Sequence, residues 1–234
     1  DGTAEPAVFR PATGLWSVRE VTRLSFGASA DQPAAGDYDG DGTAEPAVFR
    51  PATGLWSVAG LTRAFFGGAG DRAAPADFDG DGACGIAVFR AEGGLWSLPR
   101  NTRVSIGSAG DWPLPGDYDG EGTDEAGLFR PASGEWMVRS LTRFYLGSSA
   151  DRPVPGDYGG EGRRIAAVYR PCSGLWSIRD LTRIYFGNCF DSPLPADLDG
   201  DGTDDAVLFR SSAGMWSARN LTRLYFGSTG DVAV

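Results

Sequence analysis

The sequence predicts an all-β fold, a six-bladed β-propeller whose 40-residue blades have four strands each. Three observations support this prediction. The segment at residues 1–18 is identical to that at 41–58, and it returns with substitutions near residues 81, 121, 161 and 201. Strand-favouring runs alternate with Gly, Pro and Asp, and no segment keeps a helical period. The 35 glycines and 15 prolines fit a chain with many turns.

One repeat, taken as residues 33–67, is expected to form four short strands. The expected strands cover residues 33–37, 45–50, 55–58 and 62–67. An acidic loop follows the first strand, and a Pro-Ala-Thr-Gly turn follows the second. The apolar runs alternate only weakly, which is typical of strands covered on both faces. Since one unit cannot bury both faces alone, neighbouring units must cover it.

The chain is expected to form one domain, residues 1–234, that closes on itself. Its 234 residues are six short of six 40-residue periods, so both ends fall within the same kind of loop. Residues 5–27 are expected to supply the three outer strands of one blade, and the segment from Asp231 onward its inner strand. The alternative is an open stack, or a piece of a longer array.

Composition and charge argue against several classes of function. The formal net charge is −10, all 21 basic residues are Arg, and there is no His. A negative chain repels the phosphate backbone, so no nucleic-acid partner is expected. Without His, a Ser-His-Asp or Cys-His mechanism is excluded within this chain, and we expect no enzymatic activity. No apolar run is long enough to span a membrane.

The acidic loop of the second repeat predicts a Ca²⁺ site. Alternate loop positions offer oxygen atoms that can converge on one hard cation, and intervening glycines permit the sharp turns. The predicted ligands are the side chains of Asp37, Asp39, Asp41 and Glu45, and the backbone carbonyl of Thr43. Ca²⁺ is favoured over Mg²⁺, which demands a smaller and more regular shell. The alternative is a plain Asp-Gly turn without metal.

Two other loops repeat this pattern completely and are also predicted to bind Ca²⁺. Their predicted ligands are Asp117, Asp119, Glu121, Thr123 and Glu125 in one loop, and Asp197, Asp199, Asp201, Thr203 and Asp205 in the other. The longer side chain of Glu121 changes the geometry of the first set.

Two further loops depart from the pattern. One contains Asp77, Asp79 and Asp81 but ends in Gly85, so weaker Ca²⁺ binding is predicted. The loop at Asp157 has Gly and Ile at ligand positions 159 and 165, with two arginines at 163–164. This loop is predicted to hold no Ca²⁺, with an arginine supplying the positive charge instead.

The acidic loop, the apolar strand after it and a later Phe-Gly pair together resemble FG-GAP or VCBS-type repeats. The pair is Phe66-Gly67 in the second repeat and Phe186-Gly187 in the fifth, and the resemblance covers all six repeats. It implies blades like those of the integrin α-subunit propeller and of bacterial surface proteins. It also implies that Ca²⁺ binds between the first two strands of a blade. Because an ion there pins a loop between two strands, we expect its role to be structural.

Trp and Arg recur at fixed positions in every repeat. Trp16, Trp56, Trp96, Trp136, Trp176 and Trp216 lie in the third strands. They are predicted to pack between blades, and the alternative is a ring of sugar-stacking platforms. One Arg series runs from Arg10 to Arg210 and another from Arg23 to Arg223. These arginines are expected to pair with the acidic loops or stack on Trp, and the alternative is an anion-binding ring.

The three cysteines indicate in which cellular compartment the protein works. Cys172 and Cys189 lie in two loops that share one end of a predicted blade, so they could form a disulfide. That bond would favour an oxidising compartment and leave Cys84 unpaired.

Variable loops suggest where a partner binds. Residues 28–32 and their equivalents differ between repeats, and they are expected on the face opposite the acidic loops, with Trp112 and Phe190 as a candidate ligand face.

We therefore predict a Ca²⁺-stabilised, secreted or cell-surface propeller that binds protein or carbohydrate, as an adhesion module or lectin. The alternative is a structural spacer or self-assembling subunit of an extracellular assembly or filament.

Overall fold

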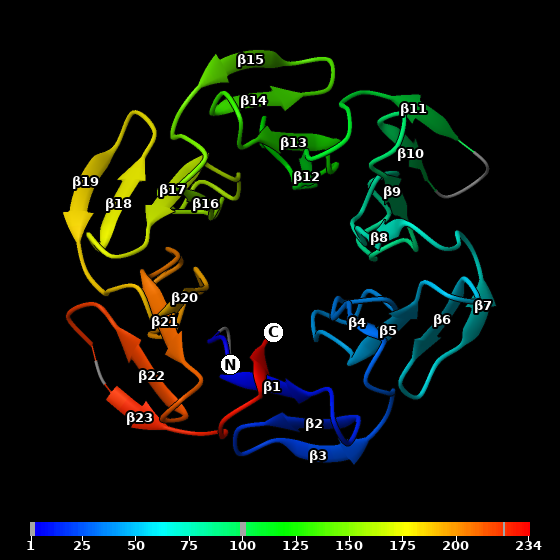
Figure 1. Cartoon of the computed structure of the whole chain (residues 1–234), viewed down its shortest axis with the longest axis horizontal. Helices are drawn as coiled ribbons and strands as arrows, with labels where there is room; N and C mark the ends of the chain where they lie inside the picture. Colours follow the sequence, from blue (N-terminus) through cyan, green and yellow to red (C-terminus); the bar gives the residue numbers. More distant parts are fainter. Residues whose placement is uncertain (1–2, 99–101, 222) are drawn as a thin grey trace.

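A computed structural model of the chain confirms the predicted ring of six four-stranded antiparallel blades (Figure 1). The structure describes residues 3–98, 102–221 and 223–234. Within these ranges, no helix is long and apolar enough to cross a membrane. The inner strands surround the centre of the ring, and the outer strands form its rim.

Each blade contains strands in inner-to-outer order. Blade 1 contains β24 (Val232–Ala233), β1 (Ala7–Arg10), β2 (Leu15–Val18) and β3 (Thr22–Ser25). Blade 2 contains β4 (Gln32–Pro33), β5 (Ala47–Arg50), β6 (Leu55–Val58) and β7 (Arg63–Phe65). Blade 3 contains β8 (Asp71–Ala73), β9 (Val88–Arg90), β10 (Leu95–Ser97) and β11 (Arg103–Ser105). Blade 4 contains β12 (Trp112–Pro113), β13 (Gly127–Arg130), β14 (Glu135–Val138) and β15 (Thr142–Tyr145). Blade 5 contains β16 (Arg152–Pro153), β17 (Ala167–Arg170), β18 (Leu175–Ile178) and β19 (Thr182–Tyr185). Blade 6 contains β20 (Ser192–Pro193), β21 (Val207–Arg210), β22 (Met215–Ala218) and β23 (Arg223–Tyr225).

Blade 1 joins the two ends of the chain, as the repeat arithmetic predicts. Strand β24 pairs antiparallel with β1, with Val8 opposite Ala233 and Phe9 opposite Val232. The backbone N–H of Val234 also donates to the carbonyl of Ala7 at 3.1 Å. The ring is therefore closed by strand pairing within one sheet.

The inner strands are shorter than expected. In blade 2 the strand ends at Pro33 rather than at residue 37, although Gly36 still bridges to Glu45 in the same register. The hydroxyl of Tyr38 donates to the carbonyl of Ala34 at 2.7 Å. This hydrogen bond is not the cause of the shorter strand, because the inner strands of blades 3 and 6 end at the equivalent positions although Phe and Leu replace this Tyr there.

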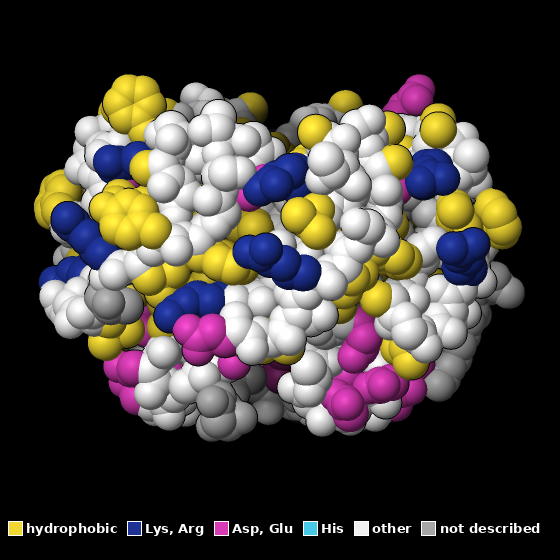
Figure 2. Space-filling view, turned by 90° about the horizontal axis from the view of Figure 1, so that it is seen from below, with side chains coloured by type: hydrophobic (Ala, Val, Ile, Leu, Met, Phe, Trp, Pro, Cys, Tyr) yellow, Lys and Arg dark blue, Asp and Glu magenta, His cyan; other side chains and the backbone are white. Residues whose placement is uncertain are grey.

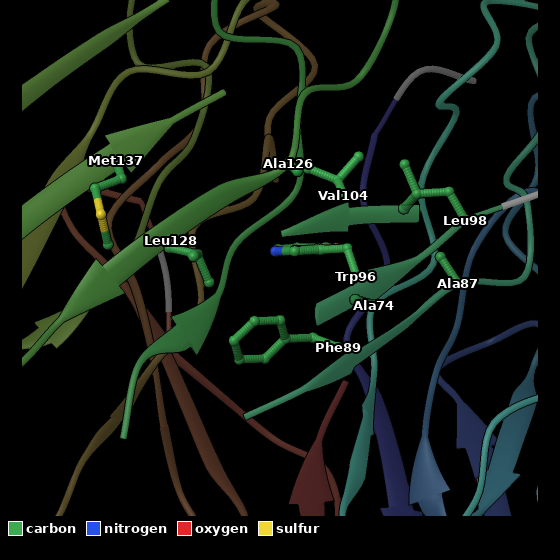
Figure 3. Close-up of a cluster of buried hydrophobic side chains, with 9 residues drawn as sticks. All are labelled: Ala74, Ala87, Phe89, Trp96, Leu98, Val104, Ala126, Leu128 and Met137. Atoms are coloured by element: carbon green, nitrogen blue, oxygen red, sulfur yellow. The ribbon is translucent and has the colours of Figure 1, made fainter. Parts of the chain in front are cut away.

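The hydrophobic core lies between blades, as the weak alternation of the strands predicts. In the cluster drawn in Figure 3, Phe89 and Trp96 of blade 3 pack with Leu128 and Met137 of blade 4. All six recurring Trp side chains are buried. Trp56 is 0% exposed, and its Nε1 donates to the carbonyl of Phe66 at 3.1 Å. The core interpretation is confirmed, and these rings are closed to a sugar.

The first Arg series pairs with partners that the sequence analysis did not expect. Arg50 donates from Nε and from its terminal amino group to both oxygens of Asp31, at 2.7 and 2.9 Å. Asp31 also accepts from the N–H of Ala28 at 2.9 Å and is buried. Equivalent ion pairs join Arg10 to Asp231, Arg90 to Asp71, Arg130 to Asp111, Arg170 to Asp151 and Arg210 to Asp191.

The expectation that this series pairs with the acidic loops or stacks on Trp is therefore wrong. Its aspartates lie in the crossovers between blades, at the other ends of the strands. One signal in the sequence could have revealed them, because an Asp stands at the same place in all six otherwise variable crossovers. A buried carboxylate needs a paired cation, and the Arg at the end of the second strand supplies it.

Candidate metal-binding loops

The first aspartate of each acidic loop organises the loop backbone. In blade 2, the Asp37 carboxylate accepts from the N–H groups of Gly40 at 2.7 Å and Gly42 at 2.8 Å. Both glycines have φ in the left-handed region, 76° and 89°, which other residues rarely adopt. The loop thus wraps around one carboxylate and turns the following acidic side chains toward it.

Four loops bring carboxylate oxygens together within 4.8 Å of one another. The groups are Asp37, Asp39, Asp41 and Glu45; Asp77, Asp79 and Asp81; Asp117, Asp119 and Glu125; and Asp197, Asp199 and Asp205. All the predicted carboxylate ligands of blade 2 converge. Glu121 and Asp201 are not in the groups of blades 4 and 6.

Asp201 is turned toward Thr203 instead. One of its carboxylate oxygens accepts from the Thr203 N–H at 2.8 Å and from the hydroxyl at 2.6 Å, and these bonds lower its pKa. The equivalent N–H of Thr43 donates to Asp41 at 2.8 Å. The predicted threonine ligand, at Thr43, Thr123 and Thr203, is a backbone carbonyl, and the structure gives no contact that tests it.

Burial and neighbouring carboxylates raise the pKa of the last acidic residue in two of these loops. Burial, and then the charges of Asp199, Asp201 and Asp197, raise the pKa of Asp205, although an N–H from Leu198 opposes the shift. The pKa of Glu125 is raised in the same way, by burial and then by the charges of Asp119 and Asp117. A divalent cation would relieve this repulsion. Several convergent oxygens are the donor set that Ca²⁺ prefers, so the residues present fit that ion.

The loop of blade 5 has a different chemistry. The Asp157 carboxylate still holds the loop backbone, because it accepts a hydrogen bond from the Gly162 N–H at 2.8 Å. Gly159 and Ile165 provide no carboxylate where the other loops have one. Arg163 pairs with Glu161 at 2.8 Å within the same loop, which supplies a positive charge there. The absence of Ca²⁺ from this loop stays a prediction.

The acidic loops also join neighbouring blades. The backbone carbonyl of Asp37 accepts from the N–H of Cys84 in the next loop at 2.6 Å. The same bond recurs from Asp124 to Asp77, from Arg164 to Asp117, from Asp204 to Asp157 and from Ala4 to Asp197. The last of these joins blade 6 to blade 1. An ion that fixes one loop would therefore also fix a contact that holds the ring together.

The candidate ligand face is less coherent than the sequence suggests. In the side view of Figure 2, acidic side chains gather toward one of the two faces of the ring, and arginines lie across its outer wall. Phe190, in the crossover to blade 6, is 78% exposed. Trp112 is partly exposed at the start of β12 in blade 4. Both lie at the crossover ends of their blades, but blade 5 separates them, and the structure gives no contact between them.

The thiols of Cys172 and Cys189 are free but adjacent. A hydrogen bond with the Cys189 thiol raises the pKa of Cys172. We expect glutathione disulfide to oxidise this pair to one disulfide, releasing two equivalents of glutathione. Closure of this loop of about 17 residues should stabilise the fold by about 3 kcal/mol. Burial raises the pKa of Cys84 to about 11, so this thiol carries little thiolate in the folded protein and should not react. The number of free thiols, titrated after unfolding, should therefore fall from three to one. Retention of all three thiols would contradict this prediction.

Comparison with known proteins adds a shared architecture. No protein-family model matches the sequence, and a search of curated proteins finds no match. One similar solved structure is an Agrocybe aegerita lectin, described as specifically recognising non-reducing terminal N-acetylglucosamine. The two share the fold. The TM-score is 0.59 at 16% identity, over 97% of this chain and 78% of the lectin chain. At this identity the similarity concerns the path of the backbone alone.

Proposed function

We propose that the chain is a Ca²⁺-stabilised extracellular β-propeller that works as a binding or adhesion module, with carbohydrate as the favoured ligand class. The observation that carries the proposal is the convergence of carboxylates in four loops of one ring, each between the inner and second strands of a blade. We further infer that the blades are FG-GAP or VCBS-type repeats, and that the protein has no enzymatic activity of its own.

Calcium has a structural role in this proposal. Extracellular Ca²⁺ modules bind their ion at roughly 10⁻⁴–10⁻³ M, so the loops would be filled in a calcium-rich medium and depleted elsewhere. Binding to the folded state alone adds its free energy to that of folding. The hydrogen bonds between successive loops carry this stabilisation from one blade to the next.

The number of bound ions is a direct prediction. We expect isothermal titration calorimetry to find about four Ca²⁺ per chain, one for each carboxylate group, with the three-carboxylate site of blade 3 weaker than the four-carboxylate site of blade 2. Asp197→Asn should weaken one site at least tenfold, because it removes a charge from the cluster. The matched change Asp157→Asn should leave the ion count unchanged. Unchanged affinity at every site in Asp197→Asn, or a lost ion in Asp157→Asn, would contradict the assignment.

Carbohydrate is favoured because the lectin that shares this fold is described as a sugar-recognising protein. The chain also presents crossover loops of varied sequence on a rigid ring, which is where binding residues commonly lie. A glycan array probed with the labelled protein in millimolar Ca²⁺, and again with chelator, tests the proposal. We expect binding to a restricted set of glycans that is lost on chelation. Absence of binding to every glycan would count against a lectin.

Exposed aromatic residues on the rim favour a second candidate, self-assembly into an extracellular structure. Phe65, Tyr145, Tyr185 and Tyr225 lie on outer strands and are 73–76% exposed. Outer strands are also open edges that can pair with another copy. Light scattering that finds a monomer at all concentrations would remove this candidate.

A further inference from the structure

Two grooves of equivalent construction lie between neighbouring blades, on the face that carries the acidic loops. In the groove between blades 4 and 5, the acidic loop and outer turn of one blade face those of the next; in the groove between blades 3 and 4, Leu98 and Thr102 line the blade 3 side beside its acidic loop. The groove between blades 3 and 4 encloses about 370 Å³, and that between blades 4 and 5 about 590 Å³. Both volumes fall within the range of about 300–1,000 Å³ that small-molecule sites occupy.

The walls of the two grooves differ in chemistry at equivalent positions. The blade 4 loop contributes Thr-Asp-Glu at residues 123–125 to the first groove. The blade 5 loop contributes Arg-Arg-Ile at residues 163–165 to the second. The blade 5 loop therefore places two arginines and an apolar side chain in the groove wall, although the Arg164 guanidinium donates to the Pro155 carbonyl at 3.4 Å.

A third arginine, Arg179, lines the same groove. The guanidinium carbon of Arg179 lies 3.8 Å from the ring centroid of Phe144, which orients this side chain. Arg179 pairs with Asp180 through Nε at 3.2 Å, and Arg163 pairs with Glu161 through Nε at 2.8 Å. Among the described residues, these pairs leave the terminal amino groups of both arginines available to another acceptor.

The rest of the groove is amphipathic and long. Leu141 and Leu181 are partly exposed on its two sides, and Thr142 adds a hydroxyl group. An adjoining cavity of about 600 Å³ shares Phe144 and Arg179 with the groove and leads to the rim at Tyr145. A ligand longer than one ring could follow this path from the loop face to the outer wall.

We propose that the groove between blades 4 and 5 binds a carboxylate-bearing oligosaccharide, such as an oligomer of a uronic acid. This assignment rests on the carbohydrate-binding function proposed above. A guanidinium group presents paired N–H donors that match the two oxygens of a carboxylate. The apolar side chains suit the C–H face of a sugar ring. Of the acidic residues in the groove, Glu161 and Asp180 are already paired with arginine, and Asp119 belongs to the metal cluster of blade 4.

Calorimetric titration of the full chain in millimolar Ca²⁺ tests this proposal, with a galacturonic acid trimer and its methyl ester as ligands. We expect the acid to bind at least tenfold more tightly than the ester. Arg163→Thr, which installs the residue found at the equivalent positions 43, 123 and 203, should weaken binding of the acid at least tenfold. Arg139→Ala, which alters the groove between blades 3 and 4 at the position equivalent to Arg179, should change it less than twofold.

Equal affinity for acid and ester, or an Arg163→Thr protein that binds as tightly as the wild type, would overturn the groove assignment. An equal loss in Arg139→Ala would overturn it as well. In each of these cases, binding of neutral glycans would leave the wider proposal standing. Failure of every saccharide to bind, whatever its charge, would overturn both. Arg163 is an exposed loop residue, so an unchanged melting temperature should show that its substitution leaves the fold intact.

Discussion

Trp56→Ala is expected to destabilise the propeller by about 3–5 kcal/mol, the usual cost of deleting a buried aromatic side chain. The Trp56 ring is fully buried, and its centroid lies 5.0 Å from that of Phe49. Because each blade packs directly on the next, the cavity would lie between sheets rather than within a flexible surface. Urea unfolding followed by fluorescence and circular dichroism measures the change.

Two further variants make this prediction specific. Trp56→Phe keeps most of the apolar volume but loses the hydrogen bond to the Phe66 carbonyl, so an intermediate cost is expected. Trp112→Ala removes a partly exposed ring and should cost under about 1 kcal/mol. If Trp56→Ala unfolds at the same urea concentration as Trp112→Ala, the recurring Trp side chains do not hold the blades together.

Arg10→Met is expected to cost about 3 kcal/mol, because it leaves the buried Asp231 carboxylate without its cation. Arg10 donates to both oxygens of Asp231, at 2.6 and 2.9 Å, and to the hydroxyl of Ser228 at 2.6 Å. The estimate lies at the lower end of the range for buried pairs, because the Arg10 side chain is 34% exposed. This pair ties the last segment of the chain to β1, so the variant should also loosen the closure of the ring.

The effect of Arg10→Met should depend on pH. Burial raises the pKa of Asp231, but hydrogen bonds from Arg10 and Ser228 outweigh it and hold the pKa below its ordinary value. A lowered pKa in the folded state gives stability that is present above about pH 4 and is lost as the pH falls through the folded pKa. The difference between wild type and variant should therefore shrink in acid. Arg19→Ala, which breaks an exposed pair with Glu20, is the control and should cost under about 0.5 kcal/mol at any pH.

Most of the fold could be predicted because the repeat leaves few choices. The period fixes the number of blades, and the ends of the chain predict the pairing of β24 with β1. The inner strands could not be bounded in the same way. The residues after Pro33 are apolar and continue the run, so the sequence does not mark where the ladder stops.

The sequence predicted where the acidic clusters lie, but not the orientation of every side chain in them. The spacing of acidic residues anticipated the four clusters, but not that Asp201 turns toward Thr203 and away from its group. The partners of the Arg10 series do not follow from charge alone, because the acidic loops carry more carboxylates, whereas burial of the crossover aspartates determines the pairing. The groove between blades 4 and 5 arises only when two blades are set side by side, so no single repeat contains it.

Thermal unfolding with and without Ca²⁺ tests the central claim most directly. At about ten times Kd, each occupied site adds about 1.4 kcal/mol, so four sites should raise the melting temperature of a chain this size by about 10 °C or more. Addition of EDTA should reverse the gain, and Mg²⁺ at the same concentration should give much less of it. A melting temperature that neither Ca²⁺ nor EDTA alters would contradict the account, because the clustered carboxylates would then be stable without an ion.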